Sequence, residues 1–224
     1  MIKNYFKTAW RNIVKHRFYS IVNIVGLFAG ITFTLLIGAY VWGELQVNKS
    51  LRNAKNQFIL TSEWKDTNMG YGLATLGPLA KRLKEDYPSL VKNYYRFDGI
   101  TSFISKGDKV FRESVQLGDS TLIKMYGFKL LFGDANTALN NPNSVVITKE
   151  KAIKFFGNSN VVGQTINMQS YNGDRRDFTI TAVLDDNIEN SVTRLDVEND
   201  NNIFIPTSAF TYFGRQDLDD WRNI

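Results

Sequence analysis

The feature that most constrains this chain is a stretch, residues 18–43, that contains no Asp, Glu, Lys, Arg or His. A helix needs about 20 predominantly apolar residues to cross a bilayer core of about 30 Å. The stretch is therefore long enough to span a membrane with some tilt. It predicts one transmembrane helix near the N-terminus of a 224-residue chain, and the remainder is long enough for an ordinary folded domain.

The flanks of this stretch favour a permanent anchor over a cleaved secretory signal. A signal peptide has an apolar run of about 7–15 residues followed by a small-residue cleavage site. Here the run is longer and ends with Tyr40 and Trp42, and such aromatic residues are typical of the membrane–water interface. Trp10, in the segment before the span, is a third candidate for the interface.

Basic residues are concentrated before the span. Residues 1–17 hold five of the 27 Lys and Arg residues and none of the 22 Asp and Glu residues, so the rest of the chain is electrically balanced. The positive-inside rule predicts that residues 1–17 are cytoplasmic and that residues 44–224 lie outside. The basic residues that set this topology are Lys3, Lys7, Arg11, Lys15 and Arg17. A balanced outer part also argues against a nucleic-acid partner, which requires a basic patch on the folded domain.

The first 17 residues also have a helical pattern. Ile2, Phe6, Ala9 and Ile13 recur at helical spacing, and the basic residues lie mostly elsewhere. The pattern is typical of a basic amphipathic helix that lies among the headgroups of the inner leaflet. An ordinary topogenic flank is the alternative interpretation.

Two glycines within the span, Gly26 and Gly30, lie four residues apart. Small residues at this spacing allow a second helix to approach closely. We therefore predict a helix-packing face at Gly26 and Gly30.

The outer part, residues 44–224, shows mixed strand and helix signals, which predict an α+β domain. Helices are expected over Leu79–Asp86, Leu122–Tyr126 and Lys149–Phe156, the last capped by Thr148 and ended by Gly157. A hairpin is expected around Asn172-Gly173-Asp174. The expected strands are Gln57–Trp64, Val91–Phe97, Ile100–Ser105, Lys109–Leu117, Phe128–Phe132, Ser144–Ile147, Thr165–Gln169, Asp177–Leu184 and Ile203–Ile205.

Side chains suited to catalysis are scarce. The only histidine, His16, lies on the basic flank, and there is no cysteine. The outer part therefore has no His-based triad and no His/Cys metal site. The neighbouring carboxylates Asp219 and Asp220 are assigned to the surface. We expect no catalytic, cofactor or metal site, and no enzymatic activity in the chain itself.

One acidic segment resembles the start of a calcium loop. Asp196, Glu198 and Asp200 alternate as the first ligands of such a loop do. The sixth and twelfth positions, however, lack the Gly and Glu that the loop requires. A solvated acidic loop is the preferred interpretation.

Several motifs occur in the order typical of one known family. They are Ala9–Asn12, Asn23–Leu27, Lys84–Pro88, Phe128–Asp134, Ala138–Thr148 and Val162–Thr165. With them the chain resembles the N-terminal part of permease subunits of the MacB/FtsX-like ABC transporter family, including their MacB-like periplasmic core domain. The segment from Ala138 to Thr165 is the most specific part of the resemblance.

The resemblance implies a domain organisation. Residues 44–141 would form the first half of a porter-like α/β lobe, and residues 142–214 a mainly β, sabre-like lobe. Residues 215–224 would begin the segment that returns to the porter-like lobe. Similar proteins continue into three more spanning helices, so the resemblance implies a truncated form.

The resemblance also implies a function. Similar permeases relay the motion of a cytoplasmic ABC ATPase to an outer domain that engages a substrate or partner, and the ATPase chain or domain binds the ATP. The implied partners are the membrane, that ATPase, a homo- or hetero-dimeric permease mate and a periplasmic adaptor, in the inner membrane of a bacterium. The alternative is a single-pass, membrane-anchored sensor or binding module.

Overall fold

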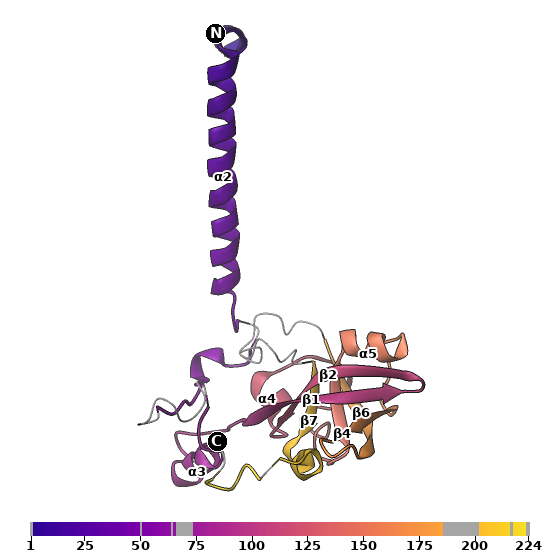
Figure 1. Ribbon diagram of the computed structural model, residues 1–224. Coiled ribbons are helices and arrows are strands. Elements are labelled where there is room, and N and C mark those ends of the chain that lie inside the picture. Colours follow the sequence, from indigo (N-terminus) through magenta and orange to yellow (C-terminus); the bar gives the residue numbers. More distant parts are fainter. Residues whose placement is uncertain are drawn as a thin grey trace. The chain divides into compact units, whose positions relative to one another are not determined.

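The computed structural model describes residues 2–49, 51–63, 65, 74–185, 202–215 and 217–222, and the chain divides into two compact units. The first unit, residues 1–47, contains the helices α1 (Ile2–Lys15) and α2 (Arg17–Leu45). The second unit, residues 48–224, contains all the described strands (Figure 1). The expected helical N-terminal segment and the expected α+β domain are both confirmed.

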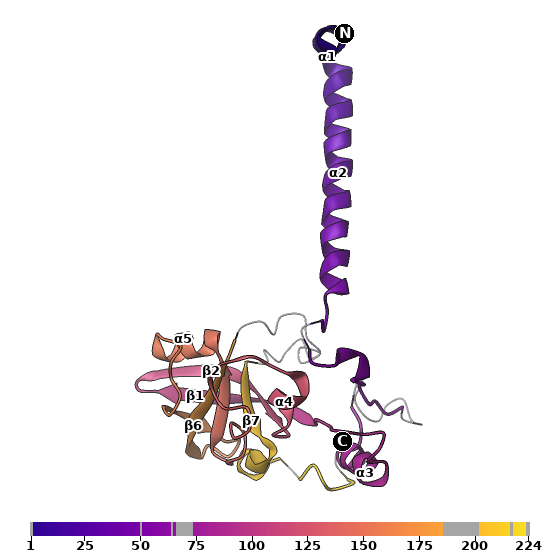
Figure 2. The ribbon, with the colours of Figure 1, turned by 180° about the vertical axis from the view of Figure 1, so that it is seen from behind.

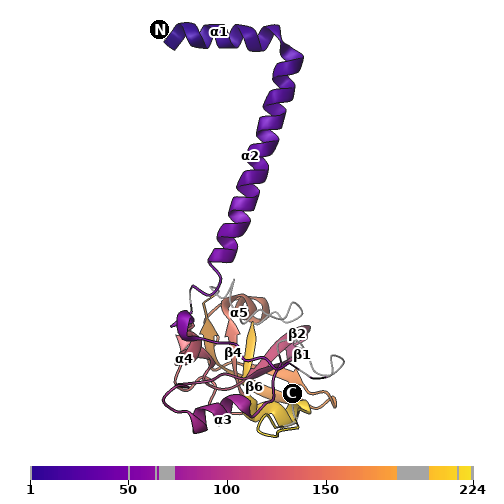
Figure 3. The same ribbon diagram turned by 90° about the vertical axis from the view of Figure 1, so that its left-hand side faces the viewer.

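The two helices of the first unit meet at His16. Its backbone angles, φ −113° and ψ 56°, are not helical, and the chain turns there from α1 into α2 (Figure 3). The amide of Ser20 donates to the His16 carbonyl at 3.0 Å, so the new helix begins immediately. The basic amphipathic segment and the apolar segment are therefore separate helices.

The second unit is built on a seven-stranded sheet in the order β3-β6-β4-β7-β2-β1-β5. Because β5 pairs with β6 as well as with β1, six of these strands close into a barrel and β3 extends it at β6. Two of the pairings, β4 with β6 and β2 with β7, are parallel. The strands are β1 (Phe97–Lys106), β2 (Lys109–Gly118), β3 (Leu130–Gly133), β4 (Ser144–Thr148), β5 (Thr165–Gln169), β6 (Arg175–Leu184) and β7 (Ile203–Pro206).

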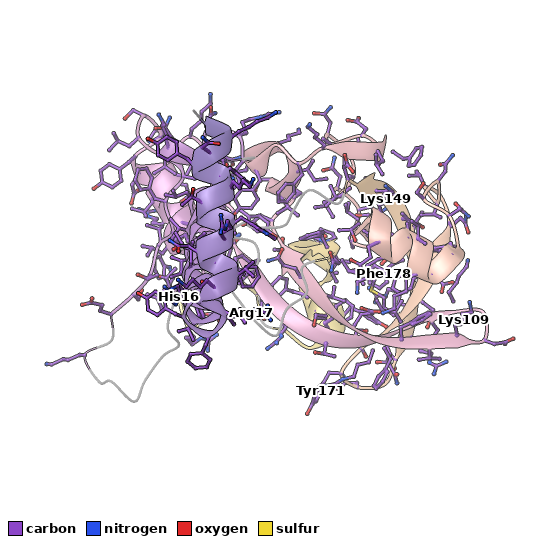
Figure 4. All side chains as sticks on the ribbon, turned by 90° about the horizontal axis from the view of Figure 1, so that it is seen from above. His16, Arg17, Lys109, Lys149, Tyr171 and Phe178 are labelled. Carbon is purple, nitrogen blue, oxygen red and sulfur yellow. The ribbon has the colours of Figure 1, made fainter. Side chains whose placement is uncertain are left out.

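The barrel closes around an apolar core. Alternate residues of the strands point inward, as the two-residue period of a strand requires. Phe178, which is 0% exposed, lies within this core, whereas Tyr171 at the tip of the β5–β6 hairpin is 93% exposed (Figure 4). The core side chains from the strands are Ile104, Val115, Leu117, Val145, Ile147, Ile166, Met168, Phe178, Ile180, Val183, Ile203 and Ile205.

A second apolar cluster covers part of the outer face of the barrel. A register shift in the β4–β6 pairing near Thr181 reverses the alternation of β6, so that Ala182 faces this cluster while Val183 faces the core. The Thr181 hydroxyl bonds to the carbonyls of Ala138 and Val145 at 2.6 and 3.1 Å, which stabilises the shift. The helix α4 (Leu122–Tyr126) provides the cover with three buried side chains.

Four further helices of the second unit lie among the described residues. They are η1 (Ala54–Asn56), α3 (Leu79–Asp86), α5 (Lys149–Phe156) and η3 (Thr207–Phe213). Thr148 caps α5 by accepting from the Lys151 amide, and Gly157 ends the helix with φ +77°, as expected. Seen from behind, α5 and α3 lie at different sides of the barrel, and α3 lies beside the C-terminal end of the chain (Figure 2).

Two strand predictions are wrong. Residues 57–63 of the predicted strand Gln57–Trp64 belong to no strand in the described part of the chain, where the amide of Ser62 donates to the Ala74 carbonyl at 3.0 Å. In the predicted strand Val91–Phe97, only Phe97 belongs to a strand. The carbonyl of Tyr94 instead accepts from the Thr121 hydroxyl, and the amide of Arg96 donates to the Asp119 carboxylate.

The expected lobes share one sheet. Strands before and after the expected boundary at residues 141/142 pair directly, β2 with β7 and β1 with β5. The assignment of residues 44–141, 142–214 and 215–224 to parts of a porter-like and a sabre-like lobe stays a prediction.

Candidate functional site

The α2 helix has a composition that suits a membrane, and its described side chains are mostly exposed. The α2 helix has a mean hydropathy of 2.2 over its most apolar window, with none of that window buried. Two of its hydroxyls are satisfied within the helix, since Thr32 and Thr34 each donate to a carbonyl four residues earlier at 2.8 Å. The helix is thus long and apolar enough to cross a membrane.

The predicted packing face of the span is open. A Cβ atom built on Gly26 or Gly30 meets no atom within 4 Å among the described residues. Tyr40 and Trp42, near the end of the helix, are 70% and 67% exposed. The helix-packing role of the glycines and the interfacial role of the aromatic residues stay predictions.

The α1 helix places basic and aromatic side chains together. Lys3, Phe6, Lys7 and Trp10 line a shallow hollow on one side of the helix. Phe6 and Trp10 are 78% and 64% exposed, so they are not used in any described core. Large apolar rings flanked by Lys are the composition of a helix that binds at a membrane surface.

In the second unit Arg96, which lies directly before β1, joins several polar groups from distant parts of the chain. Its Nε and Nη2 atoms donate to the two oxygens of Asp119 at 3.0 Å each. Its Nη1 atom donates to Asp219 at 2.7 Å and to the carbonyls of Gly77 and Leu218. Asp219 also pairs with Lys81 of α3. We call Lys81, Arg96, Asp119 and Asp219 the Arg96 junction.

The electrostatics of the Arg96 junction favour the charged forms. Hydrogen bonds from Lys81 and then Arg96 lower the pKa of Asp219 below its usual range. Burial opposes the charge of Arg96, but its bonds to Asp119 and Asp219 outweigh this and raise its pKa. The side chains of Arg96 and Asp119 are only 13% and 12% exposed, so this pair is mostly removed from solvent screening.

A polar pocket of about 340 Å³ adjoins the Arg96 junction. It lies where the parallel strands β2 and β7 end, at Gly118 and Pro206. The pocket lining is mostly polar: Tyr94, Asp119, Ser120, Thr121, Leu139, Asn140, Pro206, Thr207 and Ser208. Because Arg96 already bonds both oxygens of Asp119, the pocket presents hydroxyl and amide groups rather than a free charge.

A second ionic contact lies between the barrel and α5. Glu113 on β2 is 5% exposed and accepts from Lys151 at 2.7 Å and from Lys154 at 2.6 Å. The rings of Phe111 and Phe155 pack beside it with centroids 5.1 Å apart. This contact fixes α5 on β2, and it was not predicted from the sequence.

Sequence reasoning missed the Arg96 junction. Arg96 and Asp119 are 23 positions apart and Arg96 and Asp219 are 123 apart, and no motif links them. Asp219 was expected at the surface, and it is 39% exposed there, but it also bridges Lys81 and Arg96. The calcium-like stretch Asp196–Asp200 lies outside the described residues, and no group of potential metal ligands occurs among the residues described.

Comparison with solved structures finds several domains with partial similarity. A domain of a protein described as a permease from Porphyromonas gingivalis matches at 22% identity and a TM-score of 0.43, covering 57% of this chain and 48% of the other. The periplasmic region of MacB from Actinobacillus actinomycetemcomitans matches at 17% and 0.41, covering 59% of each chain. The extracellular domain of the noncanonic ABC-type transporter YknZ from Gram-positive bacteria matches at 14% and 0.40, covering 56% and 60%.

The chain thus spans between about half and three fifths of the length of these structures. No curated protein matches it. At the level of families, residues 20–224 match the MacB-like periplasmic core domain, which includes most of α2 and the whole second unit. The chain belongs to the MacB-like periplasmic core domain family.

Proposed function

We propose that this chain is part of a permease subunit of an ABC-type export or mechanotransmission complex. The observation that carries the proposal is the match of residues 20–224 to the MacB-like periplasmic core domain, together with a helix at Arg17–Leu45 that is able to span a membrane. In this role α1 and α2 receive the motion of a cytoplasmic ABC ATPase. The barrel unit engages a substrate or partner outside, and the ATPase binds the ATP.

The architecture suits a relay better than an enzyme. The barrel is a closed, densely packed body whose core side chains are almost fully buried, so it moves as a unit rather than deforming. Several of the charged groups in this unit are paired with one another, as Arg96 is with Asp119 and Asp219. A rigid body on a spanning helix transmits displacement through its attachment points.

The proposed placement is the inner membrane of a bacterium, with α1 on the cytoplasmic side and the barrel outside. It is supported by the five Lys and Arg residues before the span and by the absence of acidic residues there. A dimer mate contacting α2 and a periplasmic adaptor are further parts of the proposal. The exposed face at Gly26 and Gly30 suits the mate. Lipid gives helices no hydrophobic drive to associate, so contact between spanning helices depends on close packing at small residues.

The test is purification of the tagged protein from its native membrane in mild detergent, with a search for an ABC ATPase in the same complex. We expect an ATPase to co-purify in stoichiometric amount. A fluorophore on Tyr171→Cys, at the exposed tip of the β5–β6 hairpin, should then change its signal when ATP is added. Recovery of the protein without any ATPase would favour the single-pass sensor and overturn the permease proposal.

A further inference from the structure

The segment that follows the span in sequence, residues 51–57, is fastened to the C-terminal end of α4. The backbone amide of Arg52 donates to the Tyr126 carbonyl at 2.8 Å. Its Nη1 atom donates to the Lys124 carbonyl at 3.4 Å, and Gln57 Nε2 donates to the Met125 carbonyl at 3.2 Å. The last four carbonyls of a helix have no partner within it, and residues 51–57 supply donors for three of them. We call residues 51–57 the latch.

The latch is also held by burial and by its own hydrogen bonds. Leu51 is 7% exposed and packs in the outer apolar cluster with Leu122 and Tyr126 of α4. Gln57 Nε2 makes a second bond, at 2.7 Å, to the Arg52 carbonyl, which closes the latch on itself. The latch is therefore an ordered structure with specific partners rather than a flexible linker.

One glycine makes room for the latch. Gly127 ends α4 with φ +72°, and a Cβ atom built on it would lie 2.7 Å from the Cβ of Arg52. Gly157 ends α5 in the same way, with φ +77°, but a Cβ atom there meets nothing within 4 Å. Both glycines favour a left-handed backbone, and only Gly127 is also required by the close approach of Arg52.

The other end of α4 is tied to the Arg96 junction. Asp119, two residues before the helix cap, bonds to Arg96, and the hydroxyl of Thr121 bonds to the Tyr94 carbonyl at 2.7 Å. Arg96 in turn holds Leu218 and Asp219. The short helix α4 thus has the latch at its C-terminal end and the segment around Asp219 at its N-terminal side.

We propose that the latch and α4 make the segment after the span and the barrel a single mechanical unit. A flexible linker would absorb small displacements of the span by changing its own conformation. The latch instead delivers them to α4, which packs on the barrel and connects to the Arg96 junction. This inference rests on the proposed relay function and names the residues through which the relay passes.

The first test measures the latch itself by amide hydrogen exchange of the full chain in detergent. We expect the Arg52 amide to exchange roughly tenfold faster or more in Gly127→Ala, because its bond to Tyr126 is lost. Gly157→Ala, which introduces the same backbone strain without the clash, should leave that amide protected. Equal protection of Arg52 in the two variants would overturn the latch.

A second variant guards against a general folding defect. Gln57→Leu removes the two amide donors but keeps the apolar volume, and it also removes the buried Gln57 Oε1 atom, which has no hydrogen-bond partner among the described residues. We expect the Gln57→Leu chain to keep the circular dichroism spectrum of the wild type and to exchange Arg52 faster. An unchanged Arg52 amide in Gln57→Leu would contradict the role given to Gln57.

The second test measures coupling in the complex with its ATPase, using the fluorophore on Tyr171→Cys. ATP should change the signal in the Gly157→Ala background and change it by less than half in the Gly127→Ala background, with equal ATPase recovery. An equal response in the two backgrounds would overturn the coupling role of the latch but not the proposed relay function. No response in the wild type would overturn the proposed relay function, and the coupling role with it.

Discussion

The Arg96 junction allows a quantitative prediction about the stability of the barrel unit. Arg96→Met keeps the length and apolar stem of the side chain but removes the guanidinium group. In the wild type, Arg96 supplies three donors to Asp119, whose side chain is 12% exposed. In the variant only one of them remains, the backbone amide at 2.8 Å. Removing one partner of a buried ion pair costs about 3–5 kcal/mol, because the other charge is left without compensation.

The matched control is Arg82→Met on α3. Arg82 also pairs with carboxylates, Glu85 at 3.6 Å and Asp86 at 3.0 Å, but its side chain is 59% exposed. Exposed pairs of this kind contribute about 0–1 kcal/mol. The two variants therefore remove the same chemical group from a buried and from an exposed pair.

The assay is urea unfolding of the barrel unit in the detergent-solubilised full chain, followed by circular dichroism. With a urea dependence of about 2 kcal/mol per M, Arg96→Met should lower the midpoint by about 1.5–2.5 M and Arg82→Met by less than about 0.5 M. Adding Asp119→Asn to Arg96→Met should recover part of the loss, because no unpaired charge remains. Midpoints that coincide for Arg96→Met and Arg82→Met would refute this account of the junction.

Three further predictions concern other parts of the chain. Folding lowers the pKa of Asp219, so the stabilisation by this carboxylate is present above its unfolded pKa near 3.8 and is lost as the pH falls through its folded pKa. The difference in melting temperature between wild type and Asp219→Asn should therefore shrink from about pH 7 to about pH 3, and a constant difference would contradict this prediction. Gly118→Ala should destabilise the barrel unit by about 1–3 kcal/mol in urea unfolding, because a Cβ atom there overlaps the Tyr95 ring, and a loss below about 0.5 kcal/mol would show that the ring moves aside freely. Replacing both Gly26 and Gly30 by Leu should leave membrane insertion intact but abolish co-purification with the dimer mate and ATPase, whereas undiminished recovery would mean that this face contacts lipid.

Local signals in the sequence predicted the elements that depend on neighbouring residues. The helix α5 has both a capping hydroxyl at Thr148 and a glycine at its end, and the β5–β6 hairpin has its turn at Asn172-Gly173-Asp174. Each of these features is determined within about ten residues, so a single sequence is sufficient to find it. The apolar span is predictable for the same reason.

Elements that depend on distant partners were not predictable. The stretch after Gln57 has the composition of a strand, but an extended segment becomes a strand only when another strand lies beside it. The closure of the barrel requires β5 to pair with both β1 and β6, and no local pattern specifies this. Likewise, no feature of the sequence indicates that Arg96 and Asp219 are in contact.

The measurement that tests the central claim most directly is the membrane topology of the intact chain. The protein contains no cysteine, so single cysteines at Thr8→Cys in α1 and Tyr171→Cys on the barrel can be labelled with a membrane-impermeant maleimide in whole cells. The account predicts that position 171 is labelled in intact cells, after permeabilisation of the outer membrane where one is present, and that position 8 is labelled only after the inner membrane is opened. Labelling of both positions under the same condition would contradict a single span that separates a cytoplasmic α1 from an outer barrel.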